Sequence, residues 1–386
     1  MASLDKTIAL MGELIAFPTV SSDSNLEMIS YLAQRLEDVG AEVHVQTAPQ
    51  GGKANLFATL GPDEPGGILL SGHSDVVPVA DQDWTSDPFE MVERDGLLYG
   101  RGACDMKGFI AAAVVKASDY AAKPLKRPVH FSFTYDEEIG CIGAQALAEW
   151  LKERDIRPSV AIIGEPTNMR VIEGHKGCCE YTTHFHGLAG HGSMPDVGVN
   201  AVEYAVRYVS RLMELAEQLK SRAPTGSRFD PPWTTINTGS LVGGTAHNVI
   251  PETASIEWEF RPVQQRDFEF VREEIESYAQ DILLPAMRKV SPDAAITTEI
   301  MGEVAGLEPT TVNESRDIMM ELTGSNGADV VPFGTEAGIF SDLGMSAVLC
   351  GPGSIEQAHK PDEFLSISQL EKCLAMLDGL EGKVFA

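Results

Sequence analysis

Short apolar runs that end in polar, glycine-rich turns recur along this chain, and helical patterns lie between them. Four runs have the length and composition of buried strands: 67–71, 129–134, 159–163 and 347–350. Helical periodicity is evident between them, for example in 109–121 and 145–154. Strands that alternate with helices are typical of an α/β domain with a mostly parallel sheet. We therefore predict a doubly wound, mostly parallel α/β domain.

The middle of the chain has a different pattern. The expected elements are a strand, a helix, two strands, a helix and a strand, at 180–186, 200–220, 234–241, 254–261, 267–287 and 294–300. This βαββαβ order is the ferredoxin-like arrangement. We expect an inserted domain at 179–304, within a discontinuous α/β domain formed by 1–178 and 305–386.

The charge balance limits the partners. The chain has 29 Lys and Arg against 57 Asp and Glu, which gives a formal net charge of −28. Such a surface repels nucleic acid phosphates and anionic lipid headgroups. We therefore expect no nucleic acid partner and no membrane partner, and a small-molecule substrate instead.

Cysteine usage and the N-terminal segment favour a cytoplasmic protein. The six cysteines form no CxxC pair, as expected for reduced thiols in that compartment. Leu4, Ile8, Met11 and Ile15 recur at three- and four-residue steps, a pattern that favours an amphipathic helix over a signal peptide. No stretch approaches the roughly 18 apolar residues of a membrane span.

Acidic and imidazole side chains follow the predicted strands. The residues concerned are His73, Asp75, Glu137, Glu138, Glu165 and His359, together with Asp105 before a helix. Ligands of an open α/β sheet bind at the carboxyl ends of its strands, so we expect these side chains to converge on one edge. Carboxylates at one rim repel each other unless cations neutralise them. The pattern therefore predicts a two-metal site.

The ligand types narrow the choice of metal. Two histidines with several carboxylates and no cysteine suit Zn²⁺, with Co²⁺ or Mn²⁺ as substitutes. Asp75, two residues after His73, is placed to accept the second imidazole N–H and orient that ligand. One of Glu137 and Glu138 can bind metal while the other acts as general base. Metal ions would lower the pKa of a neighbouring water from about 15.7 towards about 7.

Each of these motifs also has a purely structural interpretation. An HxD after a strand is usually a solvated loop, and Glu137–Glu138 alone fits an acidic pair at a helix N-terminus. Gly164-Glu-Pro alone fits a turn. Their combination at successive strand ends is what favours the metal site.

Seven motifs carry a resemblance to a known family. They are SGHSDVVP, YGRGACDMKG, TYDEEIG, GEP, GHGSMPDVGVNA, GGTAHNVIP and GPGSIEQAHKPDE. Along essentially its whole length the chain resembles the acetylornithine deacetylase and succinyl-diaminopimelate desuccinylase family of dinuclear zinc hydrolases, which also includes carboxypeptidase G-like enzymes and aminoacylases. The resemblance implies two zinc ions per subunit, replaceable by cobalt, and an inserted lid domain that forms a homodimer.

The resemblance also implies a role for each candidate metal ligand. His73 and His359 would each bind one metal, and Asp105 would bridge the two ions. Glu138 and Glu165 would complete the coordination of the two ions.

Further roles follow from the same resemblance. Glu137 would be the proton shuttle and Asp75 the residue that supports His73. His191 resembles the lid histidine that reaches into the partner subunit's site and stabilises an oxyanion; the alternative is a loop histidine. Asn248 and Arg261 resemble residues that hold the substrate. Arg261 is chemically suited to a bidentate grip on a carboxylate, and a surface-strand arginine is its alternative.

Two segments favour one member of the family. The GHKG segment at 174–177 and the closing motif resemble acetylornithine deacetylases, whereas desuccinylases carry an Arg-rich segment at the former place. Thr335-Glu-Ala agrees with this assignment. Gly334 stands where many deacetylases have Cys, and Cys104 before Asp105 is unusual, so a related N-acyl diamino acid stays open as the substrate.

The function implied is hydrolysis of N-acetyl-L-ornithine to L-ornithine and acetate, a step of arginine biosynthesis. The alternatives of the same chemistry are a desuccinylase, another N-acyl amino acid deacylase and a dipeptidase. A relative that binds a ligand without catalysis is an alternative of another class. Such a relative would be expected to lose ligands or the base, whereas all seven positions remain in this sequence.

Overall fold

A computed structural model describes residues 3–385. The chain forms two compact units. The larger unit contains the chain up to residue 174 together with 309–330 and the part from 335 onward. The smaller unit contains 175–308 and 331–334, so it begins at His175, a little before the expected boundary at 179.

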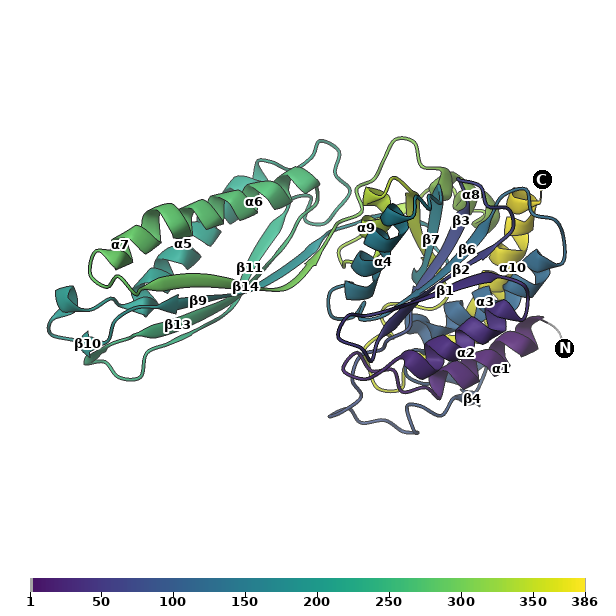
Figure 1. The fold of residues 1–386 in the computed structure, drawn as a ribbon, viewed down its shortest axis with the longest axis horizontal. Coiled ribbons are helices and arrows are strands. Elements are labelled where there is room, and N and C mark those ends of the chain that lie inside the picture. Colours follow the sequence, from purple (N-terminus) through teal and green to yellow (C-terminus); the bar gives the residue numbers. More distant parts are fainter. Residues whose placement is uncertain (1–2, 386) are drawn as a thin grey trace. The chain divides into compact units, whose positions relative to one another are not determined.

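The larger unit is built on an eight-stranded sheet with the order β1-β2-β6-β3-β7-β16-β8-β15 (Figure 1). The strands are, in sequence order, β1 Glu42–Thr47, β2 Ala54–Leu60, β3 Ile68–His73, β6 Val129–Thr134, β7 Val160–Pro166, β8 Ile172–His175, β15 Asp329–Val331 and β16 Ser346–Gly351. The four central strands β6, β3, β7 and β16 run parallel. They are the four strands expected from the sequence. At one edge β2 pairs antiparallel with β6, and β1 pairs antiparallel with β2.

Helices cover both faces of this sheet, so the predicted doubly wound α/β fold is confirmed. They are α1 Ser3–Ile15, α2 Leu26–Glu37, α3 Gly108–Ala121, α4 Ile142–Glu153, α8 Glu314–Thr323, α9 Ala337–Asp342 and α10 Ile367–Val384. Figure 1 shows α4 and α9 on one side of the sheet and α2, α3, α8 and α10 on the other. Every residue of β3, β6 and β7 is therefore buried, as expected of central strands covered on both faces. A small sheet of β17 Phe364–Ser366, β5 Leu97–Tyr99 and β4 Val92–Arg94 completes the unit.

The smaller unit has the predicted ferredoxin-like order. Its main elements are β9 Cys178–His186, α5 Ala201–Lys220, β11 Thr235–Gly243, β13 Thr253–Arg261, α6 Gln265–Ser277 with its continuation through η3 Tyr278–Leu283 and α7 Leu284–Arg288, and β14 Ala295–Val304. The antiparallel sheet has the order β11-β13-β9-β14. Ala254, Ile256, Trp258 and Phe260 alternate with more exposed residues along β13, because the helices cover only one face.

Two short features were not expected from the sequence. A two-stranded ribbon joins β10 Gly190–His191 to β12 Val249–Ile250, and a short helical turn, η2, spans Pro195–Val197.

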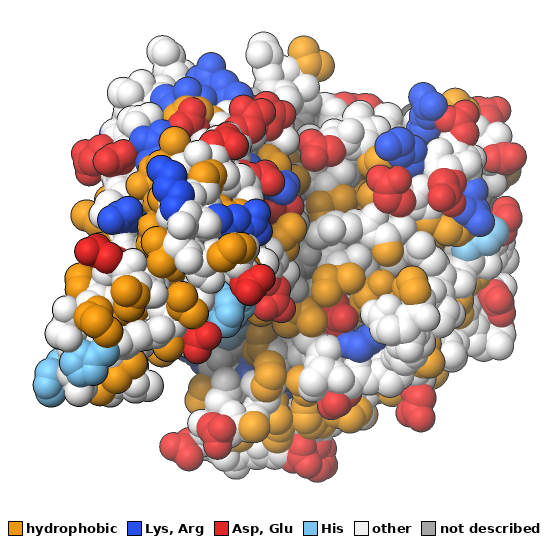
Figure 2. Space-filling model, turned by 60° about the vertical axis from the view of Figure 1, so that its left-hand side comes forward, with side chains coloured by type: hydrophobic (Ala, Val, Ile, Leu, Met, Phe, Trp, Pro, Cys, Tyr) orange, Lys and Arg blue, Asp and Glu red, His pale blue; other side chains and the backbone are white. Residues whose placement is uncertain are grey.

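Among residues 3–385, none of the helices has both the length and the apolar character that crossing a membrane requires. Figure 2 shows acidic side chains over much of the face it presents, as the net charge leads one to expect.

Candidate metal centre

Four adjacent parallel strands carry the candidate ligands at one edge of the larger sheet. His73 is the last residue of β3, and Glu165 is the penultimate residue of β7. Glu138 follows β6 by four residues, and His359 lies in the loop after β16. Asp105 comes from the turn Ala103–Lys107 (η1), directly before α3. Because β6, β3, β7 and β16 are neighbours, residues far apart in the sequence reach one place.

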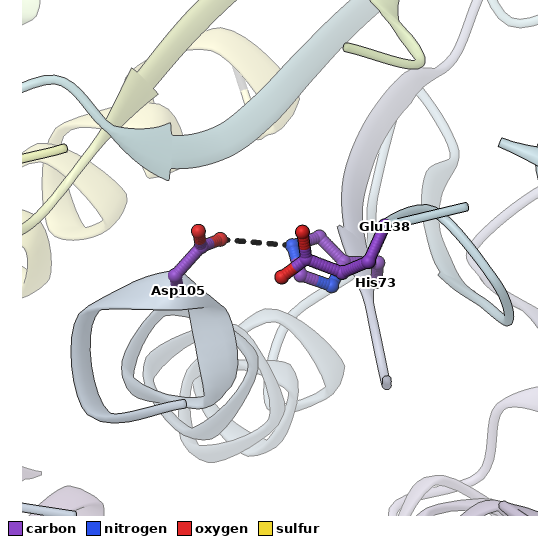
Figure 3. A group of neighbouring side chains, drawn as sticks. All are labelled: His73, Asp105 and Glu138. Atoms are coloured by element: carbon purple, nitrogen blue, oxygen red, sulfur yellow. Dashed lines mark hydrogen bonds and ion pairs between the residues drawn. The ribbon is translucent and has the colours of Figure 1, made fainter. Parts of the chain in front are cut away.

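Asp105 lies between the two histidines. Its Oδ1 is 2.9 Å from His73 Nε2, and its Oδ2 is 3.4 Å from His359 Nε2. His359 Nε2 also lies 3.0 Å from Glu138 Oε2. Figure 3 shows the Asp105 carboxylate directed towards the His73 ring, with Glu138 beside it. Each Asp105 oxygen thus faces a different imidazole, the arrangement that a carboxylate shared by two cations requires.

Glu165 has an unsatisfied oxygen. The residue is 4% exposed, and its Oε1 has no hydrogen-bond partner among residues 3–385. A buried carboxylate oxygen without a donor is costly, so this atom requires a cation or a proton.

Gly164, the residue before Glu165, lies inside β7, so this segment is not a turn. A Cβ on Gly164 would lie 2.0 Å from the Phe109 ring, so glycine lets β7 pass close to α3.

The electrostatics of the site favour the binding of cations. Burial raises the pKa of Glu137 to about 8, and the charges of Glu138 and Asp105 add to this effect, although His73 opposes it. Burial also raises the pKa of Glu138 and raises that of Glu165 well above its ordinary value. These buried carboxyl groups oppose each other's ionisation, and bound cations would relieve that repulsion.

His73 and His359 offset part of the repulsion between these carboxylates. Burial opposes ionisation of Asp105, but hydrogen bonds from His359 and His73 outweigh it and lower the Asp105 pKa. The hydrogen bonds to Asp105 and Glu138 raise the pKa of His359 to about 10. The Nε2 atoms of both histidines thus face the carboxylates with which they would share metal ions. Imidazole and carboxylate donors without cysteine suit zinc, so this donor set fits the metal ions inferred from the sequence.

Asp75 approaches His73 more closely with its backbone oxygen than with its carboxylate. Its carboxylate Oδ1 is 3.7 Å from His73 Nδ1, and the atom 2.9 Å from that nitrogen is the Asp75 backbone oxygen. The carboxylate instead accepts the backbone N–H groups of Glu137 and Glu138, at 3.0 and 3.4 Å, and the hydroxyl of Ser21 at 2.7 Å. The reason is that the loop after β6 presents its amide groups to Asp75. Asp75 thus fixes the loop that carries both glutamates, while its backbone orients His73.

Glu137 has a thiol neighbour. Cys141 Sγ donates to Glu137 Oε1 at 3.5 Å, and Cys141 is 2% exposed. No other side-chain hydrogen bond to the Glu137 carboxylate was found in residues 3–385. Glu137 Oε2 takes no part in this contact and could exchange a proton with a substrate.

Several buried polar residues near these strands were missed from the sequence. Glu336 is fully buried at the N-terminal end of α9 and accepts hydrogen bonds from Ser71 on β3 and from Thr134 on β6. Arg101 and Glu363 form an ion pair of 2.8 Å in which both side chains are 1% exposed. Arg101 lies in YGRGACDMKG and Glu363 lies in GPGSIEQAHKPDE. Sequence periodicity does not reveal that two residues so far apart in the chain form a contact.

The remaining predicted site residues lie in the smaller unit. His191 on β10 pairs with Val249 on β12, and the Gly192 N–H donates to the Asn248 carbonyl at 2.8 Å. The structure thus brings His191 and Asn248 to one ribbon, where both are exposed. Arg261 lies at the end of β13, and its Nε and Nη2 donate to Glu259 at 3.0 and 2.6 Å.

The His191 ring has a defined proton arrangement. The Ser193 backbone N–H donates to His191 Nδ1 at 3.2 Å, and the Ser193 hydroxyl lies 2.8 Å from the same nitrogen. A nitrogen that accepts an amide N–H carries no proton itself, so the neutral ring is protonated at Nε2. Nε2 is therefore a hydrogen-bond donor.

Comparisons with known proteins identify the family of this chain. Residues 69–380 match the model of Peptidase family M20/M25/M40. An acetylornithine deacetylase from Photorhabdus laumondii is 37% identical over 368 residues, which cover 94% of this chain and 92% of that protein.

Solved structures share the fold. An M20 family metallo-carboxypeptidase, Sso-CP2 from Sulfolobus solfataricus, superposes with a TM-score of 0.73 at 19% identity, over 97% of this chain and 98% of that one. The YXEP protein of Bacillus subtilis, described as a dinuclear metal binding peptidase from the M20 family, gives 0.63 at 18% identity over 98% of both chains. The match to the family model and the 37% identity confirm the resemblance inferred from the motifs: the chain belongs to Peptidase family M20/M25/M40.

Proposed function

We propose that this chain is a dinuclear metal-dependent amidohydrolase that converts N-acetyl-L-ornithine and water to L-ornithine and acetate, a step of arginine biosynthesis. The observation that carries the proposal is Asp105, whose two oxygens each face a different histidine at the ends of four parallel strands. The 37% identity with an acetylornithine deacetylase, over nearly the whole chain, supports the substrate. The composition and the cysteine pattern support a cytoplasmic enzyme.

The donor set divides into two groups around Asp105. His359 and Glu138 are 3.0 Å apart and would hold one ion. His73 and Glu165, on the adjacent strands β3 and β7, would hold the other. We propose Zn²⁺ at both places, with Co²⁺ as a functional substitute. When bound, the ions polarise the substrate carbonyl and lower the pKa of a coordinated water towards about 7.

Glu137 would move the proton in this reaction. Its pKa of about 8 in the metal-free protein lies near physiological pH, and positive charge nearby would lower it, so that the carboxylate can accept a proton. Glu137 takes a proton from the attacking water as a C–O bond forms at the acetyl carbon. It then gives this proton to the ornithine nitrogen as the amide C–N bond breaks. Asp75 holds the backbone of Glu137 and Glu138 in place through both steps.

His191 would stabilise the negative oxygen of the tetrahedral intermediate, in the site of a partner subunit. Its Nε2–H is a free donor because Ser193 occupies Nδ1. A pre-placed donor commonly contributes about 2.7–4 kcal/mol to such a transition state. Asn248 lies on the same ribbon and, with Arg261, would hold the substrate. Arg261 would release Glu259 when it binds a substrate carboxylate.

A homodimer through the smaller unit is supported by its exposed apolar surface. β11 is an edge strand, and α5 packs beside it. Met213 and Val206 on α5 are 65% and 50% exposed, and Val242 and Leu241 on β11 are 64% and 40% exposed. A two-fold contact between two such edges would bury these side chains.

A substrate panel tests the function. The purified protein, loaded with zinc or cobalt, is assayed with N-acetylornithine, succinyl-diaminopimelate, other N-acetyl amino acids and a dipeptide. We expect the highest kcat/KM for N-acetylornithine. Glu137→Gln protein purified in the same way is the control for contaminating hydrolases. A tenfold higher kcat/KM for the dipeptide or the succinylated diamine would reject the proposed substrate.

Mixing two inactive variants tests His191 and the dimer together. Glu137→Gln and His191→Ala are co-expressed or exchanged by reversible dissociation. If His191 acts in the partner's site, a mixed dimer has one site in which both groups are intact. Random mixing makes about half of the dimers mixed, which restores about a quarter of the wild-type sites. Verified mixed dimers without activity would rule out the arrangement across subunits.

A further inference from the structure

We propose that Arg101 and Glu363 act as a positioning pair that sets the spacing between Asp105 and His359, and with it the affinity of the site for the ion held by His359. The inference rests on the proposed metal centre. Asp105 and His359 come from segments about 250 residues apart in sequence, and this pair connects the two segments directly.

Glu363 holds the turn that carries Asp105. Its Oε1 accepts the backbone N–H groups of Cys104 and Asp105, at 2.9 and 3.1 Å. Its Oε2 accepts the Gly102 N–H at 2.9 Å and Arg101 Nη1 at 2.8 Å. One buried carboxylate thus binds three amide groups of a single turn. Those contacts fix the backbone from which the Asp105 side chain extends.

Arg101 holds the loop that carries His359. Its Nη1 donates to the Lys360 carbonyl at 3.4 Å, and its Nη2 donates to Gln82 Oε1 at 2.6 Å. Gln82 in turn donates from Nε2 to the His359 carbonyl at 3.0 Å. The Arg101 guanidinium group therefore binds the Lys360 carbonyl directly and is connected to the His359 carbonyl through Gln82.

His359 needs such support because little else fixes it. Its side chain is 53% exposed, and its φ of 63° is in the left-handed region, which a non-glycine residue adopts at a cost. The side-chain contacts that the structure gives it are with the carboxylates of Asp105 and Glu138. These contacts hold its ring, while the contacts from Arg101 and Gln82 hold its backbone.

The attraction between the two charges is by itself a weak explanation for this pair. Both side chains are 1% exposed, and burying two charges costs about as much desolvation energy as their attraction returns. An apolar pair of the same size would pack in this space but would leave three amide N–H groups without an acceptor. A carboxylate and a planar guanidinium are therefore required by the geometry of the two segments.

Metal titration of the Glu363→Gln variant tests the inference. Glutamine keeps the size but presents an NH₂ group where the carboxylate accepts donors, so the turn and the loop should separate. We expect calorimetric titration of the metal-free full-length protein with zinc to show two binding steps for the wild type. In the variant, one step should weaken at least tenfold while the other changes less. Amide hydrogen exchange in the metal-free variant should also accelerate in 100–106 and 355–363.

Asp267→Asn is the matched control. Asp267 is a fully buried carboxylate in the smaller unit that accepts hydrogen bonds from Arg222, Thr234 and Gln264 at 3.0, 2.8 and 2.9 Å. This control makes the same acid-to-amide change at a comparable buried network without a candidate metal ligand. It should destabilise the protein but leave both zinc steps and the exchange of 100–106 at wild-type values.

Arg101→Lys is a second variant, for use if Glu363→Gln protein does not fold. Lysine keeps the charge opposite Glu363 but cannot also reach Gln82 and Lys360, so the same zinc step should weaken. Wild-type zinc affinities in either folded variant would overturn the inference. An equal effect of Asp267→Asn would overturn it too, because a general loss of stability would then explain the result. If wild-type protein itself binds no metal, the proposed function fails instead.

Discussion

Replacing Glu137 with glutamine should abolish activity and, at the same time, stabilise the metal-free protein at alkaline pH. The activity should fall by roughly 10²–10⁴-fold, the usual weight of acid–base catalysis, while both metals stay bound. The stability effect has a different cause. In the folded metal-free protein this carboxyl is buried beside other carboxyl groups, and its charged form is therefore unfavourable.

The size and sign of the stability effect follow from the pKa. An unfolded chain releases the Glu proton near pH 4.3, whereas the folded chain keeps it up to about pH 8. Between these values the folded state binds more protons than the unfolded state, so its stability falls as the pH rises. At about 1.4 kcal/mol per pH unit, the contribution of this group reaches at most about 5 kcal/mol. Glutamine does not titrate and should lack this fall.

Urea unfolding of chelated protein at pH 5 and pH 8 measures the effect. The free energy of unfolding should fall between the two pH values more steeply for the wild type than for Glu137→Gln. Glu149→Gln makes the same exchange on the exposed face of α4, where the side chain is 73% exposed, and should follow the wild type. Equal pH dependence in wild type and Glu137→Gln would refute the electrostatic reasoning, and near-normal turnover would refute the role as base.

Three further changes test other parts of the site. Elemental analysis should approach two metal equivalents for the wild type and find about one in His359→Ala; an unchanged count would remove His359 from the ligands. Gly164→Ala places a Cβ 2.0 Å from the Phe109 ring, and it should lower the free energy of unfolding by about 1–3 kcal/mol or more, measured by denaturant titration. Cys141→Ala removes the thiol donor to Glu137 and should lower kcat more than KM, whereas Cys141→Ser should retain most of kcat. A change in KM alone would contradict the contact.

The strand ends were predictable because two local signals coincide. A buried strand shows itself as an apolar run, and the polar residue after it marks the sheet edge where ligands bind. His73 and Glu165 stand at the ends of their strands and His359 lies in the loop after β16, and the structure brings them to one edge. The βαββαβ order of the smaller unit was equally visible, since each of its six elements is long enough to show a period.

The features of the site that could not be predicted from the sequence depend on contacts between distant segments. Which atom of Asp75 faces His73 is decided by the amide groups of the loop after β6, and no local pattern contains that information. Glu336 and Glu363 are buried carboxylates whose partners lie far away in sequence. The β10–β12 ribbon has two residues in each strand, which is too short for any period.

The strand order of the larger sheet also governs when the site can come into existence during synthesis. β16 lies beside β7 in the sheet, although the whole smaller unit separates them in the sequence. A nascent chain that has emerged up to residue 340 therefore carries His73, Asp105, Glu138 and Glu165 but neither the strand β16 nor His359. Its β7 has an open edge where β16 will later pair, and this edge is exposed to other chains. The proposed half-site of His359 can therefore form only after the segment that carries β16 and His359 has emerged.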